Sequence, residues 1–199
     1  ALNSHTHLLR LKPFTLAIID EASQILEPQL LGLLSATTAD GRPAIARMVL
    51  IGDHKQLPAV VQQSEEESRV DDSQLRGIGL VDCRQSLFER LLRQYRNDAD
   101  VVYMLTRQGR MHRDVAQFPC DHFYEGLLGV VPLPHQECPL DFPQHKAEGM
   151  EKLLATNRIA FIDVPTPRHS PSAKVNQNEA ECIADAVLAV YNLYTNNGH

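Results

Sequence analysis

Two adjacent carboxylates, Asp20 and Glu21, follow directly on an uncharged, mostly apolar run of the sequence. A pair of this kind suits a nucleotide hydrolase, because one carboxylate can hold a water of the Mg²⁺ shell while its neighbour polarises the attacking water. An isolated apolar run that ends in Asp-Glu is common, and it fits equally well a core strand that runs into a solvated acidic turn. The pair therefore needs a second signal.

A second group of polar residues follows another apolar strand candidate. Gly52 and Asp53 come directly after residues 48–51, and Gln56 lies three positions beyond Asp53. Glycine permits a tight turn at the strand end, and a glutamine amide, which both donates and accepts hydrogen bonds, can reach the end of a phosphate chain. The alternative interpretation is an ordinary strand-to-loop turn closed by Pro58.

Strands must bring these two groups to one edge of a sheet. Residues 14–20 carry no charge before Asp20 and are rich in β-branched side chains, which favours a strand covered on both faces. If this strand and residues 48–51 are parallel neighbours, their carboxyl ends lie side by side, where ligands of such sheets bind. A helix near residues 28–35 and a turn over residues 37–43 would connect them.

The next predicted elements are a helix and a third strand of the same sheet. Ser86 and Glu89 form a capping box that begins the helix, and its apolar stripe is expected in the core. The stripe consists of Leu87, Phe88, Leu91, Leu92 and Tyr95. Residues 101–105 are predicted to be the third strand, and we place a domain boundary near Leu105.

Beyond Leu105 the pattern predicts a shorter series of elements. Residues 113–118 are expected to form a short helix that Pro119 stops, and residues 131–149 an irregular excursion. Residues 158–164 are a strand candidate, and residues 178–194 a helix. One face of that helix carries Ile183, Val187, Tyr191 and Tyr194.

The net charge of −6 does not indicate a nucleic-acid-binding protein, but the charge is unevenly distributed. Residues 62–82 hold six acids against two arginines, which favours a mobile surface loop. Residues 84–113 hold seven arginines against three acids. This arginine-rich segment can contact phosphates, although a solvated helix face is the ordinary alternative for most of it.

The composition predicts a globular class, as one domain or two small ones. Hydrophobic residues make up 43% of the 199 residues, and no apolar run approaches the roughly 20 residues of a membrane span. The N-terminus lacks a signal-peptide pattern. The four cysteines are widely spaced without a Cys-x-x-Cys motif, so neither a zinc knuckle nor a disulfide framework is predicted, and a reducing cytoplasm fits best.

Four ordered motifs together resemble the superfamily 1 helicases. The resemblance is to the branch that contains the nonsense-mediated-decay RNA helicase and the replication helicase-nuclease, and it runs from about residue 14 to about residue 126. Its motifs are Asp20-Glu21-Ala22-Ser23-Gln24, Gly52-Asp53-His54-Lys55-Gln56-Leu57-Pro58, Ser86-Leu87-Phe88-Glu89-Arg90-Leu91 and Gln108-Gly109-Arg110-Met111-His112, the last followed by Phe118-Pro119 and Phe123-Tyr124-Glu125-Gly126.

The resemblance implies an α/β fold of RecA-like parallel sheets flanked by helices, of the P-loop NTPase type, as an incomplete tandem. Residues 1–105 would be the C-terminal part of the first RecA-like ATPase domain, with an acidic loop over 62–82, and residues 106–199 the N-terminal part of the second. ATP and Mg²⁺ are the implied cofactors. The implied partners are single-stranded DNA or RNA and the remainder of the helicase chain, with no membrane, in the cytoplasm or, in a eukaryote, the nucleus.

The resemblance also assigns roles to the two strand-end groups. Asp20 would bind Mg²⁺ through water, and Glu21 would be the catalytic carboxylate. Gln56 would sense the γ-phosphate, and Gly52 and Asp53 would complete the nucleotide-binding residues of this domain.

Arg110 would link the second domain to the same chemistry. The resemblance implies an arginine that reaches the γ-phosphate from the other domain, and a guanidinium does stabilise charge that develops on the transferred phosphoryl oxygens. The alternative is an ordinary surface arginine.

The sequence departs from the family pattern in ways that affect activity. No Gly-x-x-x-x-Gly-Lys-Ser/Thr segment occurs, Gly109 replaces the usual adenine-stacking aromatic, and the later motifs of the second domain are absent. We therefore expect an internal fragment of a larger helicase that does not hydrolyse ATP alone. The alternative is a degenerate, non-hydrolysing scaffold that binds nucleic acid or protein. The resemblance suggests 5′-to-3′ movement.

Overall fold

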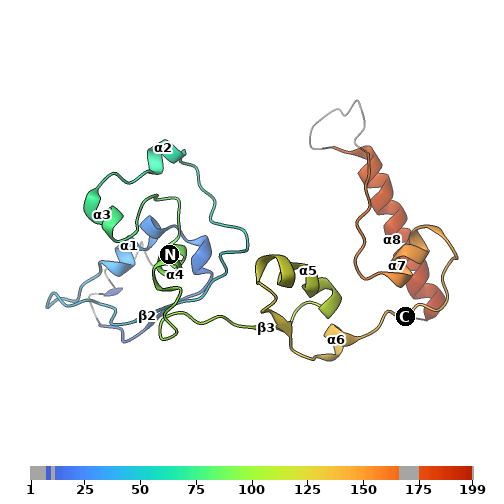
Figure 1. Cartoon of the computed structure of the whole chain (residues 1–199), viewed down its shortest axis with the longest axis horizontal. Helices are drawn as coiled ribbons and strands as arrows, with labels where there is room; N and C mark the ends of the chain where they lie inside the picture. The colour runs from blue at the N-terminus through green and yellow to red at the C-terminus, as the bar shows by residue number, and fades with distance from the viewer. Residues whose placement is uncertain (1–7, 10–11, 166–174, 199) are drawn as a thin grey trace. The chain divides into compact units, whose positions relative to one another are not determined.

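The computed structural model describes residues 8–9, 12–165 and 175–198 and separates the chain into two compact units, Ala1–Met104 and Leu105–His199 (Figure 1). The assignment of these units to parts of two RecA-like domains stays a prediction. Within the described residues, no helix is both long enough and apolar enough to cross a membrane.

The first unit is built on a parallel strand pair with a helix in the connection. β1 (Ala17–Ile19) pairs with β2 (Met48–Leu50) in parallel, with Ile18 opposite Val49. Between them lie the short 3₁₀ helix η2 (Ala22–Gln24) and helix α1 (Glu27–Leu34). This arrangement confirms the α/β class and the predicted parallel neighbours, although each strand is shorter than the run that predicted it.

The strand pair is covered on one face only. Ile19 packs against a buried cluster of Leu9, Leu33 and Ala44, whereas Ile18 is 64% exposed and Val49, its pairing partner, 44%. Side chains alternate across a strand, so one face carries the core and the other faces solvent. The expectation of a strand covered on both faces was therefore wrong for the described residues, which pack against one side of the pair.

Helix α4 (Leu87–Tyr95) begins where the sequence predicts. The Ser86 hydroxyl accepts a hydrogen bond from the Glu89 backbone N–H at 3.1 Å and donates to the Glu89 carboxylate at 3.0 Å. Leu87 is buried, but Tyr95 at the other end is 38% exposed, so the expectation that the whole apolar stripe is core was wrong. The helix packs through its N-terminal end, where Ser86 bridges to Leu26 beside η2 and α1.

The Glu27 carboxylate of α1 and the Arg90 guanidinium of α4 form a two-pronged ion pair. Arg90 Nε and Nη2 each lie 2.7 Å from one carboxylate oxygen, and Nη1 donates to the Ile78 carbonyl at 2.8 Å. The side chains are only 11% and 6% exposed. Hydrogen bonding to Glu27 raises the pKa of Arg90 above its ordinary value. This geometry joins α1 to α4 with the strongest kind of charge-assisted contact.

Removing the guanidinium leaves a buried carboxylate without its partner. We expect Arg90→Ala to lower the free energy of unfolding by about 3–5 kcal/mol, the cost typical of breaking a buried pair. Urea denaturation followed by circular dichroism measures this. Arg93→Ala is the matched control, because Arg93 is exposed on the same helix and should change stability by less than about 1 kcal/mol. Equal losses in the two variants would contradict the structural role of the pair.

The acidic segment 62–82, which its composition predicts to be a mobile surface loop, contains two short helices. It forms helices α2 (Glu65–Ser68) and α3 (Ser73–Gly77), capped by Ser64 and Asp72, whose side chains accept hydrogen bonds from backbone N–H groups of the first turns. The caps satisfy donors that a composition-based prediction does not count. The segment thus contains two capped helical stretches, and its mobility stays a prediction.

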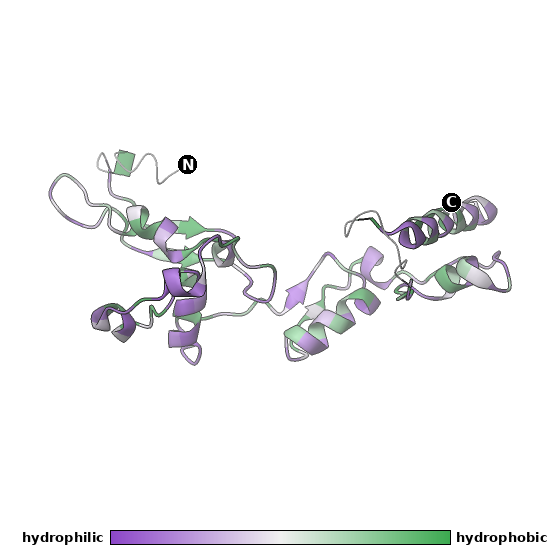
Figure 2. Ribbon diagram, turned by 90° about the horizontal axis from the view of Figure 1, so that it is seen from above, coloured by the Kyte–Doolittle hydropathy of each residue, from purple (hydrophilic) through white to green (hydrophobic). Residues whose placement is uncertain are grey.

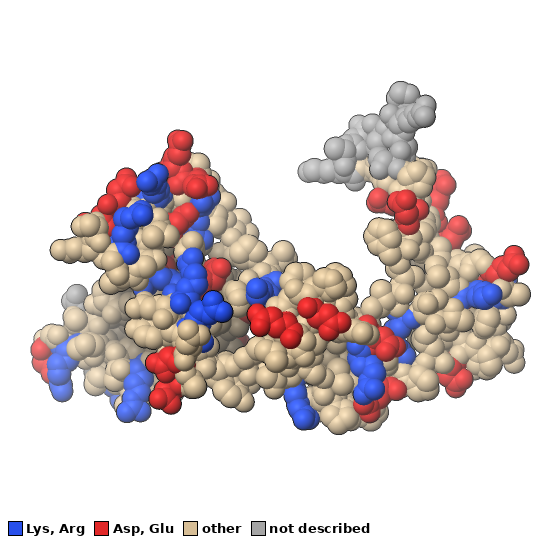
Figure 3. All heavy atoms as spheres, viewed as in Figure 1, with Lys and Arg blue, Asp and Glu red and all other residues tan. Residues whose placement is uncertain are grey.

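Arginines neutralise part of this acidic surface (Figure 3). Arg84 Nη2 lies 2.7 Å from Asp82 and 3.6 Å from Glu65, and Arg69 Nε lies 3.3 Å from Asp71. Hydrogen bonds from Arg84 lower the pKa of Asp82 to about 2. An antiparallel bridge between Arg69 and Asp82 closes the segment at its base.

Residues 101–105 do not form the predicted third strand. Val101, Tyr103 and Leu105 are 59%, 83% and 73% exposed, and the segment has no β partner among the described residues. An apolar run forms a β-strand only where a neighbouring strand pairs with its backbone N–H and C=O groups. Among the described residues no strand pairs with this segment.

The second unit opens with another parallel strand pair, which the sequence did not reveal because each strand has only two residues. β3 (Arg107–Gln108) pairs with β4 (Gly129–Val130). Helix α5 (Arg113–Phe123) connects them, and the short helix α6 (Pro134–Glu137) follows. The irregular excursion predicted for residues 131–149 therefore contains one helical turn.

Helix α5 continues through Pro119, contrary to the prediction that this proline ends it. Proline removes the backbone hydrogen bond of its own residue, and the neighbouring turns keep theirs: Ala116 N lies 2.9 Å from His112 O, and Tyr124 N 3.2 Å from Cys120 O. Burial of Ala116 at 3% exposure holds the first turns against the unit.

Two helices complete the described part of the second unit and lie side by side (Figure 2). α8 (Gln177–Asn197) confirms the predicted helix and packs on α7 (Gly149–Thr156); its buried residues are Ala189 and Leu193. Its predicted apolar face is 50–66% exposed. The strand predicted over residues 158–164 is absent; this stretch is irregular and Phe161 is 94% exposed.

Candidate nucleotide-binding site

Backbone hydrogen bonds join the two polar strand ends of the first unit. Ile51 N donates to Ile19 O at 2.8 Å, and Ala22 N donates back to Ile51 O at 2.8 Å. The ladder of β1 and β2 therefore extends beyond the strands into the loops. It brings the loop that carries Asp20 and Glu21 alongside the loop that begins at Gly52.

Ser23 and Gly52 are the point of closest approach between these loops. Ser23 is 4% exposed, and its hydroxyl accepts a hydrogen bond from Asp53 N at 3.1 Å. A Cβ added at position 52 would lie 2.8 Å from Ser23 N, a distance that real side chains do not reach. The φ of Gly52 is not positive, so glycine is needed here for the close approach of two backbones and not for a left-handed conformation.

The two carboxylates sit on an unusual backbone. Glu21 has φ 52° and ψ 35°, a left-handed conformation that costs a non-glycine residue roughly 1–3 kcal/mol. The Asp20 carboxylate accepts a hydrogen bond from Glu21 N at 3.0 Å, and Gln24 Nε2 donates to Glu21 Oε2 at 3.3 Å. Both acids are exposed. The reversal at Glu21 starts η2 immediately after β1 and leaves the two acids at the strand end.

Asp53 holds the second loop in shape. Its carboxylate accepts from Lys55 N at 3.0 Å and from Gln56 Nε2 at 2.9 Å. Gln56 itself is exposed beside a shallow hollow that is lined by Gln24, Lys55, Gln56, Leu57 and Pro58. Asp53 thus orients the predicted phosphate sensor. Sequence reasoning missed Ser23, whose small polar side chain two residues after Glu21 was the available signal.

The donor set fits a magnesium ion that is completed by other oxygen ligands. Mg²⁺ usually takes one or two carboxylates together with substrate phosphates and water. Asp20 supplies an exposed carboxylate at the strand end, with one oxygen already oriented by Glu21 N. Throughout the described ranges no three metal-binding side chains gather.

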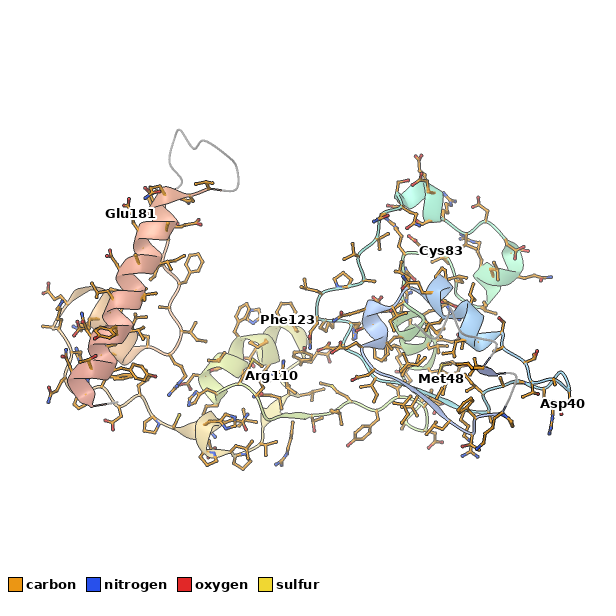
Figure 4. All side chains as sticks on the ribbon, turned by 180° about the vertical axis from the view of Figure 1, so that it is seen from behind. Asp40, Met48, Cys83, Arg110, Phe123 and Glu181 are labelled. Atoms are coloured by element: carbon orange, nitrogen blue, oxygen red, sulfur yellow. The ribbon has the colours of Figure 1, made fainter. Side chains whose placement is uncertain are left out.

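Arg110 lies in the second unit, in the turn between β3 and α5 (Figure 4). Its backbone N–H donates to Gln108 Oε1 at 2.9 Å, and its side chain is exposed. In the part of the chain that the structure describes, its guanidinium has no hydrogen-bond or ion-pair partner. It is therefore available to a ligand.

The other arginines of residues 84–113 divide into two groups. Four are occupied: Arg84 by Asp82, Arg90 by Glu27, Arg93 by Gln85 and Arg113 by Glu137. Arg96 and Arg107 have exposed side chains without a partner within the described residues. The segment as a whole is thus not a free phosphate-binding surface.

Gly109 is not required by the backbone. A Cβ at this position would meet only Leu133 Cδ1, at 3.6 Å, which is ordinary van der Waals contact. The turn would therefore accept the aromatic residue that the resemblance leads one to expect.

Comparison with known proteins gives two family matches, both described as AAA domain. One covers residues 2–64 and the other residues 83–198, more than half of the chain. The acidic helices α2 and α3 lie between the two matched segments.

Similar proteins include helicases from distant organisms. The chain is 37% identical over 117 residues to the DNA replication ATP-dependent helicase/nuclease DNA2 of Gallus gallus, which covers 59% of this chain and 9% of that protein. It is 33% identical over 132 residues to the ATP-dependent helicase upf1 of Schizosaccharomyces pombe, covering 65% of this chain and 12% of that protein. An uncharacterized ATP-dependent helicase of Methanocaldococcus jannaschii is 29% identical over 191 residues, 92% of this chain and 25% of that protein.

The chain belongs to the superfamily 1 helicases. Within the superfamily, the chain belongs to the branch that contains the nonsense-mediated-decay RNA helicase and the replication helicase-nuclease. Its parallel strand pairs are consistent with a P-loop NTPase fold. Two of these relatives carry the printed description ATP-dependent helicase, and a third is an ATP-dependent helicase/nuclease. The matched region spans at most a quarter of the three relatives described here.

Proposed function

We propose that the intact protein is a motor of the cytoplasm or nucleus that couples Mg-ATP hydrolysis to movement on single-stranded DNA or RNA. The observation that carries the proposal is the hydrogen-bonded junction of the two loops, which places Asp20, Glu21 and the Gly52–Gln56 loop at one end of a parallel strand pair. Ligands of parallel sheets bind at this end.

In the first unit, the residues divide the hydrolysis step between them. Water attacks the γ-phosphorus, the bond from phosphorus to the ADP oxygen breaks, and Glu21 accepts the proton that the water loses. Asp20 would hold a magnesium ion through water, and the ion would neutralise charge on the phosphate oxygens. The Gln56 side chain, whose Nε2 donates to the Asp53 carboxylate at 2.9 Å, contacts the γ-phosphate and so distinguishes bound ATP from ADP.

In the second unit, Arg110 supplies a positive charge to the same reaction. Its guanidinium stabilises the charge on the transferred phosphoryl oxygens, and this interaction ends when the phosphate leaves. Alternating grip on a single strand then converts the cycle into movement. We further propose that residues 1–199 alone do not hydrolyse ATP, since they contain no Gly-x-x-x-x-Gly-Lys-Ser/Thr segment.

The test is ATP hydrolysis by the intact protein with and without single-stranded DNA and RNA. We expect turnover to rise at least about ten-fold with one of the two nucleic acids, which would identify the track. Double-stranded DNA of the same sequence is the control and should stimulate less.

No hydrolysis under any of these conditions would overturn the proposal. It would favour a non-hydrolysing scaffold that binds nucleic acid or protein, and Gly109 in place of the adenine-stacking aromatic is the observation that supports this second function.

A further inference from the structure

A buried glutamine of α6 holds the turn that carries Arg110. The Gln136 side chain is 0% exposed, and its Nε2 donates to Gln108 O and to Met111 O, each at 2.9 Å. These two carbonyls are the first and last of the four-residue turn 108–111. One amide group therefore fixes both ends of the turn from a position 25 residues or more along the chain.

Two further side chains hold the same turn. Gln108 folds back on it: its Nε2 donates to Met111 O at 2.8 Å, and its Oε1 accepts from Arg110 N at 2.9 Å and Met111 N at 2.7 Å. On the outside, His135 Nε2 lies 2.9 Å from Gly109 O, and because a carbonyl only accepts, this nitrogen carries the proton. Side-chain hydrogen bonds thus reach backbone groups of all four residues of the turn.

Stability alone does not explain a glutamine at position 136. Burying an amide is unfavourable unless its polar atoms are paired, and Gln136 Oε1 has no partner within the described residues. The Gln136 side chain therefore leaves its oxygen unpaired within the described residues, while its Nε2 donates two hydrogen bonds to the turn. α6 itself is fixed to the start of α5 by the ion pair of Arg113 with Glu137, at 2.5 Å.

We propose that Gln136, assisted by His135, is a positioning residue for Arg110. The inference rests on the proposed function, in which Arg110 acts on the γ-phosphate. Holding the backbone on both sides of Arg110 sets where its exposed side chain begins, and so aligns the guanidinium before nucleotide binds. Alignment of the guanidinium before nucleotide binds lowers the activation barrier for hydrolysis, because misplacement by about 1 Å can cost up to 10²-fold in rate.

The experiment places Gln136→Leu and His135→Ala in the intact protein, each with Arg110 present and with Arg110→Ala. We expect Gln136→Leu to lower kcat for ATP about ten-fold and His135→Ala about three-fold, with KM nearly unchanged. In the Arg110→Ala background neither should lower kcat further. Gln117→Leu is the matched control, because Gln117 is exposed on α5 of the same unit and should leave kcat unchanged.

A binding measurement separates positioning from folding. Gln136→Leu should weaken the affinity for ADP with aluminium fluoride, a mimic of the transferred phosphoryl group, by about the same factor as kcat, and leave the affinity for ADP unchanged. If Gln136→Leu fails to fold, His135→Ala carries the same test, since His135 is exposed.

The outcomes distinguish this inference from the proposed function. Wild-type kcat in both variants, or an equal loss in the Arg110→Ala background, would overturn the positioning role while Arg110 keeps its own. Full activity of Arg110→Ala alone would instead overturn the function proposed for Arg110, and with it the inference.

Discussion

Arg110→Ala in the intact protein is expected to lower kcat for ATP hydrolysis by about 10³- to 10⁵-fold, the range that an arginine acting on a transferred phosphoryl group supplies. The structure separates this chemical effect from stability. The Arg110 side chain is exposed, and its guanidinium has no partner among the described residues, so its removal breaks no hydrogen bond or ion pair within them. The folded protein and its melting temperature should remain nearly unchanged.

Steady-state hydrolysis at saturating single-stranded nucleic acid measures the loss. Arg107→Ala is the control, because Arg107 is an exposed arginine three residues away, also unpaired within the described part of the chain. It should keep nearly full kcat. Near-wild-type hydrolysis by Arg110→Ala would show that Arg110 is an ordinary surface arginine.

Glu21→Gln is expected to lower kcat by about 10²- to 10⁴-fold while nucleotide binding is retained, because an amide of the same size cannot accept the proton of the attacking water. The hydrogen bond from Gln24 to Glu21 Oε2 can still form to the amide oxygen, so the loop should keep its shape. Hydrolysis together with binding of a fluorescent ATP analogue separates the two effects.

The chain offers a matched control for this substitution. Glu125 is the other described non-glycine residue with a left-handed backbone, at φ 55°, and it lies in the second unit. Glu125→Gln makes the same chemical change on the same kind of backbone and should leave kcat unchanged. Equal effects of the two substitutions, or loss of ATP binding by Glu21→Gln, would reject Glu21 as the proton acceptor.

The features that could be predicted from the sequence are those that a short, continuous pattern of residues indicates. The apolar runs before Asp20 and Gly52 indicated the two parallel strands, and Ser86 with Glu89 indicated the start of α4. Their motif order indicated the superfamily 1 helicases. The proximity of the Asp20 and Gly52 loops followed from strand order alone, because the carboxyl ends of parallel neighbours meet at one edge.

The features that it missed depend on partners far away in the chain. β3 and β4 have two residues each, too few for a periodic pattern, and residues 101–105 have the composition of a strand without a neighbour to pair with. Pro119 was predicted to end α5, as proline usually ends a helix, but the neighbouring helical turns keep their backbone hydrogen bonds. Gln136 lies in no recognised motif, and only the fold brings it to the turn of Arg110.

In the mechanism proposed above, the left-handed backbone at Glu21 sets activity against stability at this position. Glycine adopts φ 52° without the steric strain of a side chain, so a glycine at position 21 would relieve strain in the folded protein and also remove the carboxylate. The fold therefore tolerates a locally unfavourable residue at the position of the proposed proton acceptor. A thermostabilised version of this protein should be designed with position 21 held fixed, since selection for melting temperature alone would tend to discard Glu21.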